Sequence, residues 1–72
     1  MGVYQSATVP EVRVRTAKQI ISGNIIDSMG KRAVVRMLRK EGRIPSRVEP
    51  EERLVFGGWE FTFRWYEVET FN

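Results

Sequence analysis

Apolar and polar residues alternate in two separate stretches of the chain, and such alternation predicts β-strands. The first stretch is Val12-Arg13-Val14-Arg15, near the N-terminus, where apolar and basic side chains take turns. Pro10 precedes it, and proline suits the start of an edge strand because its missing N–H interrupts no ladder there. The pattern therefore predicts a short N-terminal strand at the edge of a sheet.

The second alternating stretch predicts an antiparallel β-hairpin over about residues 53–66. Leu54-Val55-Phe56 is followed by Gly57-Gly58 and then by the aromatic run from Trp59 to Trp65. Two glycines tolerate the positive φ angles of a two-residue hairpin turn. We therefore expect the turn at Gly57-Gly58, with the apolar runs on either side as its two strands.

The aromatic side chains of this run predict a core face. The rings at positions 59, 61, 63 and 65 fall on one side of the strand. They could stack on exposed bases, but a small domain needs an apolar partner for its helices, so we expect them in the core. Tyr66 breaks the alternation, which predicts that the strand ends or bulges there. Residues 67–72 are then a frayed tail or a last short element.

Between these stretches the apolar period lengthens to three and four residues, which predicts two helices. The first is expected over about residues 16–29, with Thr16 as its N-cap and an apolar stripe from Ala17 to Met29. Gly23-Asn24 weakens this stripe, because glycine costs about 1 kcal/mol in a helix interior relative to alanine. This leaves open an early end to the helix, followed by a second short turn.

The second helix is expected over about residues 31–41 and gives the clearest helical signal. After the break at residues 27–30, Asp27 or Ser28 could cap its start. Gly42 stands where a left-handed C-terminal cap favours glycine, and Pro45 prevents continuation. Its inward face is formed by four apolar residues, Ala33, Val34, Met37 and Leu38.

These elements together predict a small α+β fold of winged-helix-like order. A short N-terminal strand, two helices and a C-terminal antiparallel hairpin follow one another along the chain. With 72 residues there is room for one hydrophobic core. We therefore expect residues 1–72 to form a single domain.

The composition argues against catalysis, a metal site and a membrane location. The chain contains no cysteine and no histidine, the residues that most often supply nucleophiles, general bases and metal ligands. The carboxylates of the 49–52 turn lack helical spacing and are expected to be solvated. No apolar run approaches the ~18 residues of a membrane span, and no signal-peptide pattern is present. We expect no enzyme activity, no cofactor or metal, and a cytoplasmic or nucleoid-associated protein.

Charge is strongly segregated along the chain although the net charge is only +3. Residues 13–48 carry ten basic and two acidic side chains, whereas residues 49–72 carry six acidic and two basic ones. A positive region of this size attracts nucleic acid or an acidic protein surface. The alternative is that the two parts of the chain pair and neutralise each other.

Arginines recur at three- and four-residue steps along the second helix and opposite its apolar face. The guanidinium fork matches both phosphate oxygens and the O6/N7 edge of guanine, which makes arginine suitable for reading DNA. We therefore predict a DNA-binding surface made of seven residues, Lys31, Arg32, Arg36, Arg39, Lys40, Arg43 and Arg47.

The stretch from Ala33 to Val48, AVVRMLRKEGRIPSRV, resembles the recognition helix and following turn of excisionase-type winged-helix proteins. These are small DNA-binding recombination directionality factors and related regulators, in which an R-x-G-R-I-P-like exit precedes a hairpin wing. The resemblance implies a helix in the major groove, a wing near the minor groove and DNA bending at integrative-element sites. It assigns base or phosphate contacts to Arg32, Arg36, Arg39 and Lys40, and the helix exit to Arg43 and Arg47. The acidic loop after Val48 departs from the family pattern, as does the turn between the helices.

The function expected from these features is duplex DNA binding in an accessory or regulatory role, in recombination or transcription, as in a phage or mobile element. A single small domain makes few contacts, so self-association on DNA is one option. Two alternatives stay open. The basic face could dock on an acidic protein partner, as a small inhibitor does, or the aromatic sheet could bind RNA.

Overall fold

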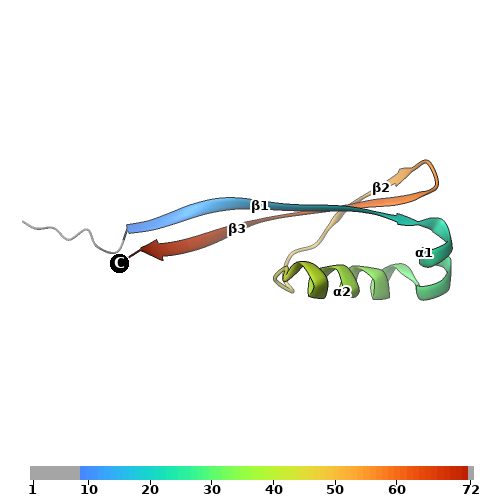
Figure 1. Ribbon diagram of the computed structural model, residues 1–72, viewed down its shortest axis with the longest axis horizontal. Coiled ribbons are helices and arrows are strands. Elements are labelled where there is room, and N and C mark those ends of the chain that lie inside the picture. The colour runs from blue at the N-terminus through green and yellow to red at the C-terminus, as the bar shows by residue number, and fades with distance from the viewer. Residues whose placement is uncertain (1–8, 72) are drawn as a thin grey trace, which may run out of the picture.

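The computed structural model describes the backbone of residues 9–71 and the side chains of residues 11–68. One layer is a three-stranded antiparallel sheet of β1 (Val9–Ser22), β2 (Glu51–Val55) and β3 (Gly58–Phe71), in the spatial order β1-β3-β2. The helices α1 (Gly23–Met29) and α2 (Lys31–Gly42) connect β1 to the rest of the chain and lie beside one end of the sheet (Figure 1). The predicted α+β class, with a strand, two helices and a C-terminal antiparallel pair, is confirmed.

The long strands β1 and β3 form a ribbon that is only partly covered by helices. They pair over their full length, from Val9 opposite Phe71 to Ser22 opposite Gly58. The short strand β2 adds a third strand only beside residues 58–62 of β3. The remaining part, residues 9–16 and 64–71, projects beyond α2 as a two-stranded arm (Figure 1).

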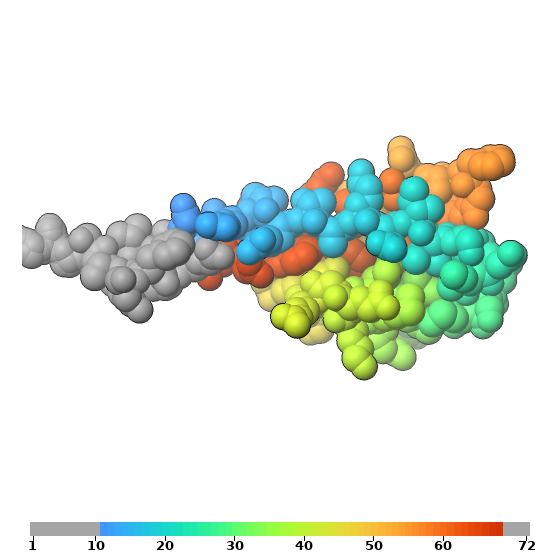
Figure 2. Space-filling model, viewed as in Figure 1, coloured from blue at the N-terminus to red at the C-terminus, as the bar shows by residue number. Residues whose placement is uncertain are grey.

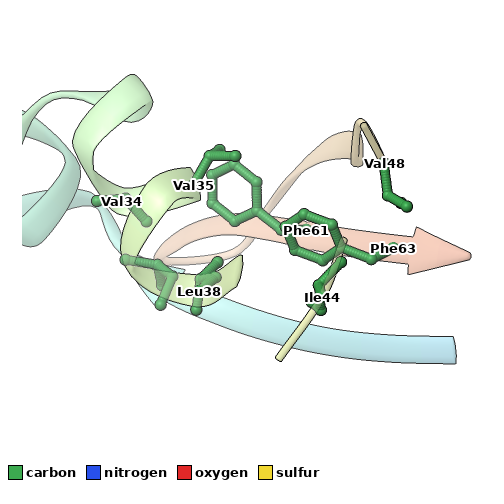
Figure 3. Close-up of a cluster of buried hydrophobic side chains, with 8 residues drawn as sticks. Val34, Val35, Leu38, Ile44, Val48, Phe61 and Phe63 are labelled. Carbon is green, nitrogen blue, oxygen red and sulfur yellow. The ribbon is translucent and has the colours of Figure 1, made fainter. Parts of the chain in front are cut away.

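The hydrophobic core lies between α2 and the sheet. Phe61 and Phe63 on β3 are 0% and 1% exposed and pack against α2 and the segment that follows it (Figure 3). Trp59 and Trp65 are half-buried at the two ends of this row. The prediction that the aromatic face is core is therefore confirmed. The buried apolar residues are Ile21, Val34, Val35, Leu38, Ile44, Val48, Phe61 and Phe63.

The face of β3 that carries the apolar side chains changes after Trp65. Because successive side chains of a strand point to opposite faces, Tyr66 and Val68 lie on the side of the ribbon away from Trp65 and the core. Their partners in register are Val14 and Val12, and all four side chains are more than half exposed. The expected strand end at Tyr66 and the expected tail over residues 67–72 are wrong as far as residue 71, because β1 supplies a partner for this segment. Residue 72 lies outside the described residues.

The first helix is shorter than predicted. Residues 16–22 belong to β1, and α1 begins only at Gly23, with Ser22 as N-cap accepting a 3.4 Å hydrogen bond from the N–H of Ile25. Thr16 is therefore not the cap. The three- and four-residue period was misleading because pairing with the aromatic strand outweighs local propensity. As a strand, this segment buries Ile21 and leaves Ile20 58% exposed.

The second helix matches its predicted bounds to within one residue, but its caps differ. Gly30, with φ 86°, precedes it without a side-chain cap, so neither Asp27 nor Ser28 caps α2. At the other end the left-handed residue is Arg43, with φ 52°, and not Gly42. The N–H of Ile44 donates a 2.8 Å hydrogen bond to the carbonyl of Arg39, as in a Schellman motif.

Two glycines shape the hairpin, which spans residues 51–71 and not 53–66. The loop is Phe56-Gly57, with φ 85° at Gly57, and Gly58 is already the first residue of β3. A Cβ atom at Gly58 would overlap the backbone carbonyl of Ile21. Glycine at this position therefore permits β1 and β3 to approach closely where their ladder begins.

Candidate nucleic-acid interface

The outward side of α2 carries basic residues in a row. Val34, Val35 and Leu38 are buried against the core. Arg32, Arg36 and Lys40, which follow at four-residue steps, are exposed on the opposite side. Figure 2 shows α2 as an outer ridge along one side of the molecule, left uncovered in this view.

This basic row continues beyond the helix. Arg43 and Arg47 are exposed in the segment that leads from α2 towards β2. Within the part of the chain that the structure describes, five of the seven predicted site residues form no ion pair with an acidic side chain. These five residues, named the basic face below, are Arg32, Arg36, Lys40, Arg43 and Arg47.

Arg39 has partners within the chain. Its guanidinium Nη2 lies 3.2 Å from Glu49 Oε2, and its Nε donates a 3.0 Å hydrogen bond to the carbonyl oxygen of Val48. The Arg39 side chain is only 21% exposed. Arg39 therefore ties α2 to the segment before β2 and is not a freely exposed member of the arginine row.

Lys31 also has partners within the chain, at the start of α2. Its Nζ lies 3.0 Å from Glu52 Oε1 and 4.0 Å from the centroid of the Trp59 ring. The ammonium group thus combines an ion pair with a cation–π contact. Sequence reasoning did not find the Trp59 contact, because these residues lie far apart in the chain and no spacing rule connects them.

A groove of about 400 Å³ lies between α2 and residues 49–52. These residues, named the 49–52 segment below, were predicted as part of a turn, but residues 49–50 form no regular element and Glu51 and Glu52 are the first residues of β2. Four side chains of the groove lining are basic and two are acidic, so its charge remains positive after internal pairing. Arg32 and Arg36 of the basic face belong to this lining. Its lining residues are Lys31, Arg32, Val35, Arg36, Arg39, Glu49, Pro50 and Glu52.

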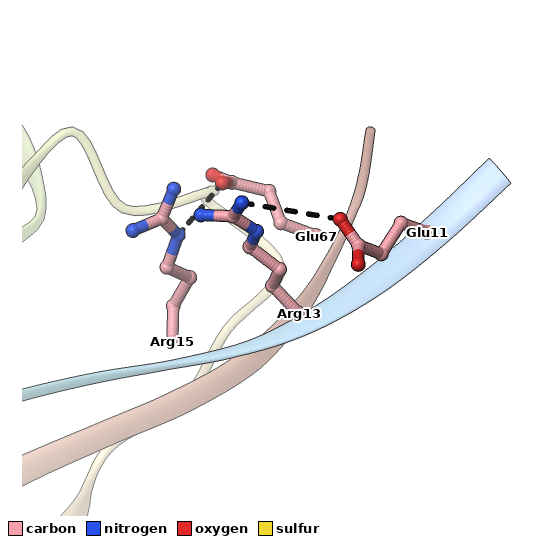
Figure 4. Close-up of polar contacts among 4 residues, drawn as sticks. All are labelled: Glu11, Arg13, Arg15 and Glu67. Atoms are coloured by element: carbon pink, nitrogen blue, oxygen red, sulfur yellow. Dashed lines mark hydrogen bonds and ion pairs between the residues drawn. The ribbon is translucent and has the colours of Figure 1, made fainter. Parts of the chain in front are cut away.

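Two ion pairs along the arm involve basic residues of β1. Glu67 Oε1 lies 2.8 Å from Arg15 Nε across the arm, and Arg13 Nη2 lies 3.9 Å from Glu11 Oε1 (Figure 4). These contacts neutralise β1 and not α2. Among the described residues, ion pairs between the basic and the acidic part of the chain therefore involve two of the seven predicted site residues. These are Lys31 and Arg39, which pair with the 49–52 segment.

On the helix-covered side of the described sheet, the outer rings of Trp59 and Trp65 are half-buried and the two central rings are closed to bases. Phe61 and Phe63 are fully buried and cannot stack on a nucleotide without unfolding the core. The exposed ring on the other side of the ribbon is Tyr66, which lies beside Val14. This geometry favours α2 over the sheet as the nucleic-acid contact.

The described residues contain no group of three or more histidine, cysteine, aspartate or glutamate side chains placed to hold a metal ion. None of the described helices is long and apolar enough to cross a membrane.

No protein-family model, curated protein or solved structure matches this chain.

Proposed function

We propose that this protein binds duplex DNA through the basic face of α2, as a small accessory or regulatory factor of the excisionase type. The observation that carries the proposal is the exposure of Arg32, Arg36 and Lys40 in one row without internal ion pairs among the described residues. Four-residue spacing brings like charges close together, which costs the isolated helix a few tenths of a kcal/mol per pair. A polyanion placed along the row offsets that repulsion.

The dimensions of α2 suit this partner. A helix of 12 residues is about 18 Å long, and the major groove of B-DNA is about 12 Å wide, enough to admit one helix. Phosphate contacts would supply most of the affinity, and one or two arginines on guanine edges would supply the sequence preference. The order of helix, basic exit and hairpin agrees with the excisionase resemblance. With this role we propose a location in the cytoplasm or on the nucleoid.

Salt dependence of binding to a short labelled duplex tests the proposal. If all five residues of the basic face contact phosphates, the slope of log K against log salt is about −4.5, from about 0.9 per contact. Lys18→Gln is the matched control, because Lys18 is exposed on the sheet face opposite α2 and is expected to leave the slope unchanged. Absence of binding at low salt, or an affinity that does not change with salt, contradicts DNA binding.

An acidic protein partner is the second candidate. It is favoured by the carboxylates of Glu49 and Glu52, which already lie against Arg39 and Lys31. Competition between the labelled duplex and a glutamate-rich peptide distinguishes the two candidates. If the peptide displaces the duplex at equal charge concentration, the protein partner is preferred.

A further inference from the structure

The 49–52 segment places two carboxylates against α2, one near each end of the helix, with Glu49 in the connection before β2 and Glu52 as the second residue of β2. Glu52 lies at 3.0 Å from Lys31 and Glu49 at 3.2 Å from Arg39, on the two sides of Pro50. The groove between the 49–52 segment and the helix is lined by both pairs together with Arg32 and Arg36. The 49–52 segment is thus acidic and lies along the flank of a basic helix.

A carboxylate and a phosphate make the same kind of contact with a lysine or arginine. Both present anionic oxygens that accept charge-assisted hydrogen bonds from ammonium or guanidinium groups. The positions of the Glu49 and Glu52 carboxylates therefore mark where phosphate oxygens can bind. Lys31 and Arg39 are about 12 Å apart along the helix axis, so they would take two different phosphates of a strand.

The exposure of the ion pairs permits exchange. The Glu49 and Glu52 side chains are 81% and 34% exposed, and their partners Arg39 and Lys31 are 21% and 39% exposed. Ion pairs with this much solvent access are weak and are screened by salt. A polyanion that brings several phosphates to α2 at once can displace them.

We propose that Lys31 and Arg39 are two phosphate-binding positions of α2, and that Glu49 and Glu52 occupy them in the free protein as internal competitors. The inference rests on the proposed function and extends it. The 49–52 segment then lowers the affinity for every duplex that contacts Lys31 and Arg39. The acidic loop that departs from the excisionase pattern is then part of how binding is tuned.

Variants that replace the carboxylates of the 49–52 segment by neutral amides test this inference. Glu49→Gln and Glu52→Gln are each expected to tighten binding to a short labelled duplex by about threefold to tenfold at fixed salt. Glu51→Gln is the matched control, since it removes the same charge from the same segment of the chain. Its carboxylate lies 3.6 Å from Arg64, away from the α2 groove, and we expect a change below about twofold.

A double-mutant cycle tests the effect at the Lys31–Glu52 pair. Lys31→Gln is expected to cost little affinity in the wild-type background, where Glu52 occupies Lys31, and about threefold to tenfold more in the Glu52→Gln background. Thermal unfolding of each variant shows whether it is folded.

The outcomes separate this inference from the proposed function. If the wild-type protein binds the duplex and the three glutamine variants bind alike, the competitor role is wrong and DNA binding stands. Equal costs of Lys31→Gln in both backgrounds also overturn the competitor role. If neither the wild-type protein nor the Glu49→Gln/Glu52→Gln double variant binds at low salt, both proposals are wrong.

Discussion

Arg39 Nε donates a 3.0 Å hydrogen bond to the carbonyl oxygen of Val48, nine residues further along the chain. This contact gives one arginine of the predicted row a structural role. It holds the exit of α2 against the segment whose Val48 side chain is buried in the core. The arginines of α2 therefore fall into two groups. Arg32 and Arg36 face solvent, whereas Arg39 maintains the fold through its Nε and uses a different atom, Nη2, to pair with Glu49.

Replacing Arg39 is expected to lower stability. Arg39→Ala removes a charged donor from the Val48 carbonyl and an ion pair from Glu49, for a cost of about 1–2 kcal/mol. Urea unfolding followed by tryptophan fluorescence measures the change. An Arg39→Ala variant as stable as the wild-type protein would show that the hydrogen bond contributes nothing.

Replacing the exposed pair Arg36 and Lys40 is expected to affect binding and not stability. Both residues are exposed, so the Arg36→Gln/Lys40→Gln variant should unfold within about 0.5 kcal/mol of the wild-type protein. Its salt slope on duplex DNA should fall by about 1.8, from 0.9 for each lost phosphate contact. An unchanged slope means that these side chains do not touch the phosphates.

Gly58 is expected to tolerate no side chain. Gly58→Ala places a methyl group on the Ile21 carbonyl at the first pair of the β1–β3 ladder, and should cost about 1–3 kcal/mol. Gly23→Ala is the control, because its nearest neighbour, the Gly57 oxygen, lies at an ordinary 3.9 Å. Equal melting temperatures of the two variants would contradict the close approach.

The buried ring of Phe61 is expected to dominate the core. Phe61→Ala should destabilise the protein by about 3–5 kcal/mol, which is comparable to the whole stability of a domain of this size. Phe56 at the hairpin tip is fully exposed, so Phe56→Ala should change stability by less than about 0.5 kcal/mol. Circular dichroism of the two variants makes the comparison, and a folded, stable Phe61→Ala variant contradicts this view of the core.

The left-handed residue at the end of α2 offers a stabilising change. Arg43 has φ 52°, a conformation that costs a side chain with a Cβ atom about 1 kcal/mol relative to glycine. Arg43→Gly should therefore raise the melting temperature by several degrees while removing one base from the basic face. A lower melting temperature would show that the Arg43 side chain contributes more than its backbone costs.

Local patterns predicted the elements whose partners lie close in sequence. The second helix and the hairpin were found because their apolar spacing and their glycines act within a few residues. The same rules failed over residues 16–22, where Ile20 and Ile21 fit a helical stripe as well as a strand. The deciding factor was the partner strand, more than thirty residues away, which no local pattern reveals.

The candidate site was predicted in the same uneven way. Spacing predicted an exposed row of Arg32, Arg36, Arg39 and Arg43 flanked by Lys31 and Lys40. Of these, Arg32, Arg36, Lys40 and Arg43 are exposed. Spacing gave no sign that Lys31 and Arg39 pair with Glu52 and Glu49, because those ion pairs depend on how the 49–52 segment lies beside the helix. The charge segregation along the chain suggested internal pairing but not which acids would supply it.

The β1–β3 ribbon also determines the order in which the chain can fold. Its first possible pair, Ser22 with Gly58, requires closure of a loop that contains both helices and β2, whereas every later pair only extends an existing ladder. We therefore expect the slow step of folding at the helical end of the ribbon. The strands of the arm then pair progressively outward to Val9 and Phe71. Substitutions in the arm should consequently speed unfolding and leave the refolding rate almost unchanged.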